Sequence, residues 1–182
     1  MKVIVVTGSV CSGKTTVAKM LAEKLGYIYI DVSRLISKYK LSSGYDRKRK
    51  CKVVDVGKLN GVLVNMINQY KENREVRGVI VDSHLSHYLP RRYVHLCIVV
   101  KCGLKELNKR LKRRGYWEGK VRENLQCEIF DVCLNESKEL GHRIFVIDTT
   151  KGINIRSIMK EFKKIIGLGD NYGTKSSGRR TK

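Results

Sequence analysis

Long apolar runs are missing from this chain. No apolar stretch approaches the ~20 residues that a membrane-spanning helix needs, so we expect no membrane association. The apolar segment at residues 3–6 leads directly into a polar, glycine-containing segment with no cleavage region, which favours a strand over a signal peptide. We therefore expect an intracellular protein, cytoplasmic and, if the host is a eukaryote, nuclear as well.

Paired cysteines are also missing. The six cysteines show neither C-x-x-C spacing nor the cysteine and histidine spacing of a zinc site, and they lie at positions 11, 51, 97, 102, 127 and 133. Reduced thiols packed as small apolar residues fit this pattern. Disulfides would be expected only if the host were a hyperthermophile.

Acidic residues are scarce, with 17 aspartates and glutamates against 38 lysines and arginines. The resulting formal net charge of +21 at pH 7 exceeds what the phosphates of one bound nucleotide require. A positive field of this size attracts polyanions, and RNA is the most common polyanion in a cell. We expect RNA or an RNA-bound partner, with a generally basic proteome or simple solubility as the alternative.

The chain otherwise has the composition of one globular domain, with 182 residues, 42% hydrophobic and 30% charged. Apolar runs typical of covered parallel strands occur at residues 3–6, 27–30, 79–81, 96–100 and 143–147. Helical spacing of apolar residues occurs at residues 13–24, 59–70, 104–111, 121–132 and 155–166. This alternation predicts an α/β fold, a five-stranded parallel sheet with helices on both faces.

Two polar segments interrupt the alternation, at residues 38–52 and 113–122. Both are too polar for a core, so they are either loops or lids over a site, or surface insertions. The composition after residue 167 turns to glycine, serine, lysine and arginine, which predicts a disordered basic tail over residues 168–182. A single domain is expected over residues 1–167.

A phosphate-binding loop is predicted between the first strand and the first helix. The sequence there has the pattern Gly8-x-x-x-x-Gly13-Lys14-Thr15. The glycines let backbone N–H groups turn toward phosphate oxygens, and the helix N-terminus adds partial positive charge. Lys14 would neutralise the outer phosphates of ATP and the Thr15 hydroxyl would bind Mg²⁺. A turn that only joins strand to helix would leave the lysine unexplained.

Asp82 ends the apolar run at residues 79–81, which places its carboxylate at the carboxyl edge of the predicted sheet. Ligands of open α/β sheets bind at this edge. On its own, such an aspartate is equally well explained as a turn former. The phosphate loop upstream favours a second role, in which Asp82 holds Mg²⁺ through water.

Arginines close the helix predicted at residues 104–111. Arg110 and Arg114 are four residues apart and share a helix face, with Gly115 directly after them. Guanidinium groups bind phosphoryl oxygens through two hydrogen bonds and stay ionised. The segment predicts a lid that closes over the transferring group, and a solvated basic helix end is the alternative.

Several short motifs now stand in a fixed order: G-S-V-C-S-G-K-T-T at 8–16, G-Y-D at 44–46, V-D-S-H-L at 81–85, L-P at 89–90, R-L at 110–111, R-G-Y at 114–116 and E-N-L-Q-C-E-I at 123–129. Together they resemble the adenylate kinase isoenzyme-six family, which includes the coilin-interacting nuclear ATPase and its archaeal counterparts. The resemblance extends over about residues 3–164.

The resemblance implies a P-loop NTPase fold of the nucleoside-monophosphate-kinase type with a short lid. It implies a broad-specificity nucleoside monophosphate (adenylate) kinase that also hydrolyses ATP, with ATP, Mg²⁺ and AMP or another nucleoside monophosphate as ligands. It also implies a role in maturing the small ribosomal subunit, through a small-subunit ribosomal protein and pre-rRNA. A metabolic or other small-molecule kinase without a ribosome role is the main alternative, and an RNA-binding module that uses nucleotide only structurally is another. We expect a monomer.

By position, the resemblance assigns the ATP loop to residues 11–16, the monophosphate-binding region to 31–54 and the lid to 113–123. Its Asp-x-His element corresponds to Asp82 and His84, and the histidine would orient the attacking water. The expected catalytic residues are Lys14, Asp82, His84, Arg110 and Arg114. The expected nucleotide-binding residues are Gly8, Cys11, Ser12, Gly13, Lys14, Thr15, Thr16, Arg114 and Lys151, the last beside the adenine. Thr15 and Asp82 are the expected metal ligands.

Two departures from the family pattern affect this assignment. Val10 and Cys11 stand where the family usually has Pro-Gly, and a Cβ at position 11 crowds a turn where glycine is usual. Lower nucleotide affinity and sensitivity to oxidation are therefore expected. The basic residues at 48–50 replace a more acidic stretch of some relatives, which leaves the acceptor nucleotide open.

Overall fold

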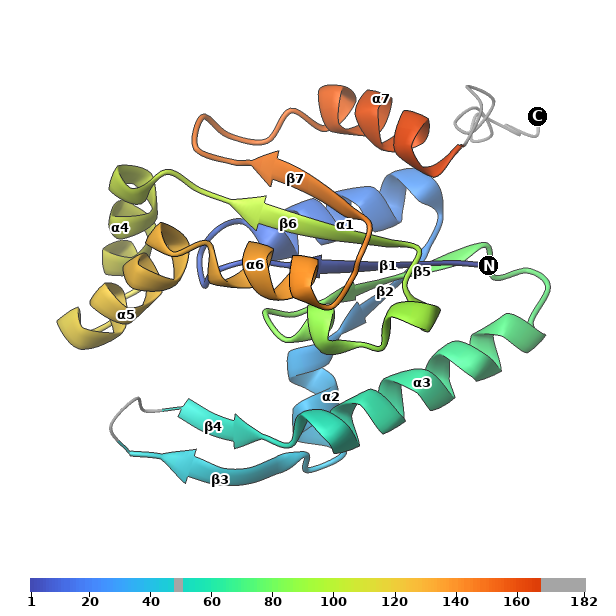
Figure 1. Ribbon diagram of the computed structural model, residues 1–182, viewed down its shortest axis with the longest axis horizontal. Coiled ribbons are helices and arrows are strands. Elements are labelled where there is room, and N and C mark those ends of the chain that lie inside the picture. Colours follow the sequence, from blue (N-terminus) through green and yellow to red (C-terminus); the bar gives the residue numbers. More distant parts are fainter. Residues whose placement is uncertain (48–50, 168–182) are drawn as a thin grey trace, which may run out of the picture.

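The computed structural model describes residues 1–47 and 51–167, so the predicted tail at 168–182 and the residues at 48–50 lie outside the described part. A five-stranded parallel sheet forms the centre, in the order β2-β5-β1-β6-β7 (Figure 1). Its strands are β1 (Lys2–Thr7), β2 (Ile28–Asp31), β5 (Gly78–Asp82), β6 (Leu96–Lys101) and β7 (Ile144–Asp148). The predicted α/β fold is confirmed, and because all strands are parallel, their carboxyl ends meet at one edge.

Helices cover both faces of the sheet, as the continuous apolar strands require. Ile4 and Val6 of β1 face α1 (Lys14–Leu25) and α7 (Ile155–Ile166). Val3 and Val5 face the other way, toward α2 (Val32–Lys38), α3 (Val56–Glu72) and α6 (Val132–Glu139). Two short 3₁₀ helices, η1 (Ser86–Tyr88) and η2 (Arg91–Tyr93), join β5 to β6.

Two further helices stand beyond the carboxyl edge of the sheet (Figure 1). They are α4 (Leu104–Arg113) and α5 (Glu118–Ile129), which pack on each other around Leu107, Leu111 and Val121. The turn between them passes through Gly115 at φ 74°. The polar segment predicted at residues 113–122 is therefore a short turn followed by the first part of α5.

Of the alternatives predicted for residues 38–52, which were a loop or lid over a site and a surface insertion, an irregular loop is wrong. Residues 42–54 form an antiparallel hairpin of β3 (Ser42–Asp46) and β4 (Cys51–Val54), which is a separate two-stranded sheet and projects from the body (Figure 1). The residues of β3 are mostly exposed, so no alternation of apolar and polar residues announced the strand.

The single helix predicted across residues 121–132 is also wrong. α5 ends at Ile129 and α6 begins at Val132, because Asp131 adopts the left-handed conformation with φ 51°. The Asp131 carboxylate pairs with Lys101 at the end of β6. In the part of the chain that is described, no helix is both long and apolar enough to cross a membrane.

Candidate active site

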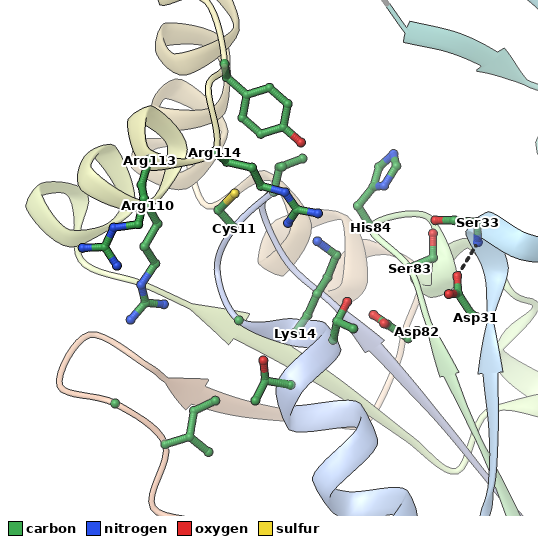
Figure 2. Close-up of a pocket in the computed structure, with 17 residues that line it drawn as sticks. Cys11, Lys14, Asp31, Ser33, Asp82, Ser83, His84, Arg110, Arg113 and Arg114 are labelled. Atoms are coloured by element: carbon green, nitrogen blue, oxygen red, sulfur yellow. Dashed lines mark hydrogen bonds between the residues drawn. The ribbon is translucent and has the colours of Figure 1, made fainter.

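A cavity of about 970 Å³ opens at the carboxyl edge of the sheet, between the start of α1 and the turn that follows α4 (Figure 2). The predicted site residues that line it are Cys11, Gly13, Lys14, Thr15, Thr16, Asp82, His84, Arg110 and Arg114. Gly8, Ser12 and Lys151 do not line it, although Gly152 and Ile153, directly after Lys151, do. Asp31 and Ser33, at the start of α2, complete the wall opposite α4.

The phosphate loop curls closely against the sheet. Gly8 has φ 141°, and a Cβ at this position would lie 2.3 Å from the carbonyl oxygen of Val100 in β6. Ser12 is fully buried beneath the loop, and its hydroxyl has no hydrogen-bond partner among the described residues. Gly8 and Ser12 therefore shape the loop from behind rather than facing the cavity.

Cys11 occupies the most strained position of the loop. Its φ of 65° lies in the left-handed region, which a residue with a Cβ adopts at a cost. The backbone at position 11 therefore has the conformation that favours glycine, which is the usual residue there in the family. The side chain lies on the cavity wall beside Val10.

Lys14, in the first turn of α1, extends its ammonium group into the cavity (Figure 2). Its Nζ donates a hydrogen bond to the carbonyl oxygen of Ser9 at 3.2 Å. Burial lowers the pKa of Lys14, while the negative charge of Asp82 acts in the opposite direction. From this position the Lys14 ammonium group can replace its hydrogen bond to the Ser9 carbonyl oxygen with one to a phosphate oxygen.

Asp82 is buried at the end of β5 and has one free oxygen. Its Oδ2 accepts a hydrogen bond from the Tyr29 hydroxyl at 2.8 Å, and burial together with this bond raises the pKa of Tyr29. Its Oδ1 is buried without a hydrogen-bond partner in the described chain. With the Thr15 side chain on the same cavity, this orphaned carboxylate oxygen fits the oxygen ligands that Mg²⁺ prefers, one or two from protein and the rest from water and phosphate. No group of three or more histidine, cysteine, aspartate or glutamate side chains suited to a metal occurs among the residues described.

His84 lies in the loop after β5 and faces the cavity (Figure 2). Desolvation, followed by the positive charge of Lys14, lowers the pKa of His84 to about 4. The imidazole is therefore neutral near pH 7 and keeps one nitrogen that can accept a hydrogen bond from water.

The three arginines of the α4 end differ in direction. The Arg114 side chain points toward Lys14, whereas that of Arg113 points away from it (Figure 2). Arg110 is already engaged: Nη2 donates to the Thr149 carbonyl at 2.8 Å, Nη1 to the Thr149 hydroxyl at 3.0 Å, and Nε to Glu106 at 2.9 Å. In this arrangement Arg114 is the arginine that faces the phosphate loop, and Arg110 braces the wall beside it.

Three residues that the sequence did not predict stabilise the site: Glu128, Thr149 and Tyr29. Glu128 of α5 is buried, accepts a hydrogen bond from the Ser9 hydroxyl and accepts another from the Cys102 N–H at 2.9 Å. Thr149, after β7, bonds the carbonyl oxygen of Ser12 as well as Arg110. Thr149 and Tyr29 could have been suspected from their places near strand ends, but the burial of Glu128 follows only from how α5 packs.

A parallel sheet in this order, with a glycine loop, a lysine and a strand-end aspartate at its carboxyl edge, is the architecture of a P-loop kinase. Comparisons with known proteins agree. The family described as "AAA domain" matches residues 4–131. The chain is 37% identical over 136 residues to the adenylate kinase isoenzyme 6 homolog of Caenorhabditis elegans, covering 75% of this chain and 72% of the relative.

A putative adenylate kinase of Methanocaldococcus jannaschii is 37% identical over 163 residues, which cover 90% of this chain and 85% of the relative. The chain therefore belongs to the adenylate kinase isoenzyme 6 family, as the sequence motifs predicted. Among solved structures, the shikimate kinase of Acinetobacter baumannii aligns with a TM-score of 0.60 at 15% identity, covering 92% of this chain and 94% of that one. At this identity the likeness shows the fold alone, and the fold is that of P-loop kinases. Fold and relatives together identify a phosphotransferase of the kinase type.

Proposed function

We propose that this protein is a broad-specificity nucleoside monophosphate (adenylate) kinase that transfers the terminal phosphate of ATP to AMP or another nucleoside monophosphate, and that also hydrolyses ATP. The observation that carries the proposal is the convergence of three groups on one cavity. Lys14, Arg114 and the unpartnered Oδ1 of Asp82 all belong to it, at the edge where the phosphate loop begins. Two cations and one free carboxylate oxygen suit a polyphosphate that carries Mg²⁺.

Phosphoryl transfer requires alignment and charge neutralisation more than covalent chemistry. The amides of residues 11–16 hold the phosphates, Lys14 neutralises the outer ones, and Arg114 stabilises charge on the transferring group. Thr15 and Asp82 would hold Mg²⁺, which, when bound, supplies positive charge between the phosphates. For hydrolysis, the neutral His84 accepts a hydrogen bond from water and orients it.

The remaining assignments complete this proposal. The monophosphate-binding region spans residues 31–54, which contain α2 and the hairpin, and the lid spans residues 113–123 within one domain over 1–167. Lys151 lies beside the adenine, in the loop whose next residues line the cavity. Arg110 contributes by holding Ser12 and Thr149 in place.

The kinase assignment is tested with ADP as the only substrate. Formation of ATP and AMP in equal amounts is expected, because an adenylate kinase runs in both directions. Lys14→Ala should lower the rate by a factor of about 100 or more, since a positioned charge at the transferring phosphate is lost. Lys24→Ala, which removes an exposed lysine at the other end of α1, is the matched control. Absence of both products would eliminate the kinase, and a full rate in Lys14→Ala would place the site elsewhere.

We also propose that the enzyme acts in small-subunit maturation, with a small-subunit ribosomal protein and pre-rRNA as partners. The net charge of +21 supports this over a purely metabolic kinase. ATP turnover should rise when a small-subunit ribosomal protein or pre-rRNA is added. An unchanged rate with both would favour the metabolic alternative.

A further inference from the structure

Both helices beyond the sheet edge are bonded directly to the phosphate loop. From α5, Glu128 accepts a hydrogen bond from the Ser9 hydroxyl. From α4, Arg110 donates a hydrogen bond to the Ser12 carbonyl oxygen at 3.4 Å. The hydroxyl of Thr149, after β7, donates a hydrogen bond to the same oxygen. Ser9 and Ser12 lie on either side of the strained Cys11. The two helices are therefore hydrogen-bonded to the loop both before and after this residue.

The outer face of α4 carries three lysines. Lys105, Lys109 and Lys112 are spaced by four and three residues, so they share one helix face, and all three are exposed. The only acidic residue of α4 is Glu106, which is paired with Arg110 at 2.9 Å. Within the described chain, none of the three lysines takes part in an ion pair.

An exposed aromatic ring follows α4 in the chain. Trp117, at the start of α5, is 42% exposed, and its indole packs against Gly119, where an added Cβ would lie 1.7 Å from the ring. One side of the ring thus rests on the protein while the rest is open to solvent. Lysines that follow a phosphate backbone, together with an open aromatic ring for an unpaired base, are the elements that bind single-stranded nucleic acid.

We propose that the outer face of α4, with Trp117, binds single-stranded RNA and that this binding raises ATP turnover through the contacts of Arg110 and Glu128 with the phosphate loop. The inference rests on the proposed function and names the surface that the RNA uses. RNA held along α4 restrains the helix that Arg114 caps, and Arg114 faces Lys14 (Figure 2). A restrained α4 keeps Arg114 and the loop in the arrangement that transfer requires.

The binding half of the proposal is tested with a fluorescent oligouridylate on the full chain at several salt concentrations. The triple variant Lys105→Gln/Lys109→Gln/Lys112→Gln should bind at least about tenfold more weakly, and its log–log salt slope should be smaller by about 2, because three phosphate contacts are lost. The matched control Arg156→Gln/Lys160→Gln/Lys164→Gln removes the same charge from exposed positions of α7. Equal losses in the two triple variants would overturn the assignment to α4.

The coupling half is tested by ATP turnover with and without the oligouridylate. Turnover of the wild type should rise, whereas the α4 triple variant should keep its basal rate and lose the rise. Glu128→Gln should still bind RNA but respond less, and Ser9→Ala, which removes the same contact from the other side, should behave alike. A full response in both of these variants would overturn the coupling.

The outcomes separate this inference from the function on which it rests. If the wild type binds no RNA, the proposed RNA role fails together with the inference. If the wild type and the α4 variant bind equally well, only the inference fails. Conversion of ADP to ATP and AMP needs no RNA, so the kinase assignment is judged independently of either result.

Discussion

At the scale of single residues, Cys11 shows how the phosphate loop departs from its family. Its φ of 65° lies in the left-handed region, where a Cβ is strained in the folded chain. We expect Cys11→Gly to raise the free energy of unfolding by about 1 kcal/mol, since glycine adopts this conformation without a steric penalty. Nucleotide affinity should also rise, because the Cβ that crowds the turn is removed. Urea unfolding and ATP titration measure the two effects.

Cys11→Ala is the control, because it removes the thiol but keeps the Cβ. It should match the wild type in stability. If alanine stabilises the protein as much as glycine, the thiol rather than the backbone is responsible.

Tyr29 is the second residue whose removal has a defined consequence. Its hydroxyl is the one hydrogen-bond donor to Asp82 seen among the described residues, at 2.8 Å. Tyr29→Phe leaves both carboxylate oxygens without a partner, which should lower the free energy of unfolding by about 1–3 kcal/mol. The Mg²⁺ concentration for half-maximal activity should also rise, because the carboxylate is no longer held in one orientation. Tyr39→Phe, at a position 45% exposed, should leave both values unchanged.

Local motifs predicted some site residues and not others, for a physical reason. Lys14 and Asp82 were predictable because a strand, a loop and a helix adjacent in sequence position them. Glu128 meets Ser9 across 119 residues, and Tyr29 meets Asp82 across 53. Contacts of this kind depend on strand order and helix packing, which no local pattern encodes.

At the scale of elements, the hydrogen bonds that link α4 to the loop after β7 can be tested directly. Thr149 accepts a hydrogen bond from Arg110 Nη1 at 3.0 Å and donates to the carbonyl oxygen of Ser12. Thr149→Val keeps the shape and removes both bonds, so we expect a loss of about 1–2 kcal/mol in the free energy of unfolding and a slower conversion of ADP. Thr149→Ser retains the hydroxyl and should recover most of both. A loss of stability in Thr149→Ser with none in Thr149→Val would point to packing of the methyl group instead.

The same scale shows where periodicity is informative. The long helix α3 was predicted because one of its faces is apolar, and the buried strands were predicted because their apolar runs are continuous. The hairpin was missed because β3 is nearly exposed throughout. The break between α5 and α6 was missed because apolar spacing continues across it while Phe130, 66% exposed, points to solvent. Asp131 ends the pattern there through its backbone conformation and its pairing with Lys101.

At the scale of the whole molecule, the order of apolar segments predicted the fold class and composition predicted the sign of the charge, but neither predicted the spatial arrangement. Alternating strands and helices indicate a parallel sheet, yet the central place of β1 depends on pairings with β5 and β6 that lie far apart in sequence. Likewise, a charge of +21 predicts attraction to polyanions, whereas this total does not say that three exposed lysines share the outer face of α4.

Histidine burial gives the molecule a predictable response to acid. The chain has four histidines, and the pKa of each is lowered, in every case chiefly by burial. In the unfolded chain they titrate near 6.5, so below this pH the unfolded state binds more protons than the folded state. The free energy of unfolding should therefore fall as the pH falls below about 6.5, by up to about 1.4 kcal/mol per pH unit for each fully linked histidine.

His87 is one of these groups, and only 1% of it is exposed. Its Nδ1 lies 2.8 Å from the Thr7 hydroxyl and its Nε2 lies 2.9 Å from Glu136, whose charge only partly opposes the effect of burial. Gln at this position can keep an acceptor and a donor but cannot be protonated. In urea unfolding between about pH 7.5 and pH 5, His87→Gln should lose stability less steeply than the wild type. Parallel curves would mean that His87 binds protons equally in the folded and unfolded states over this range, and the acid response would then have to arise from groups other than this buried histidine.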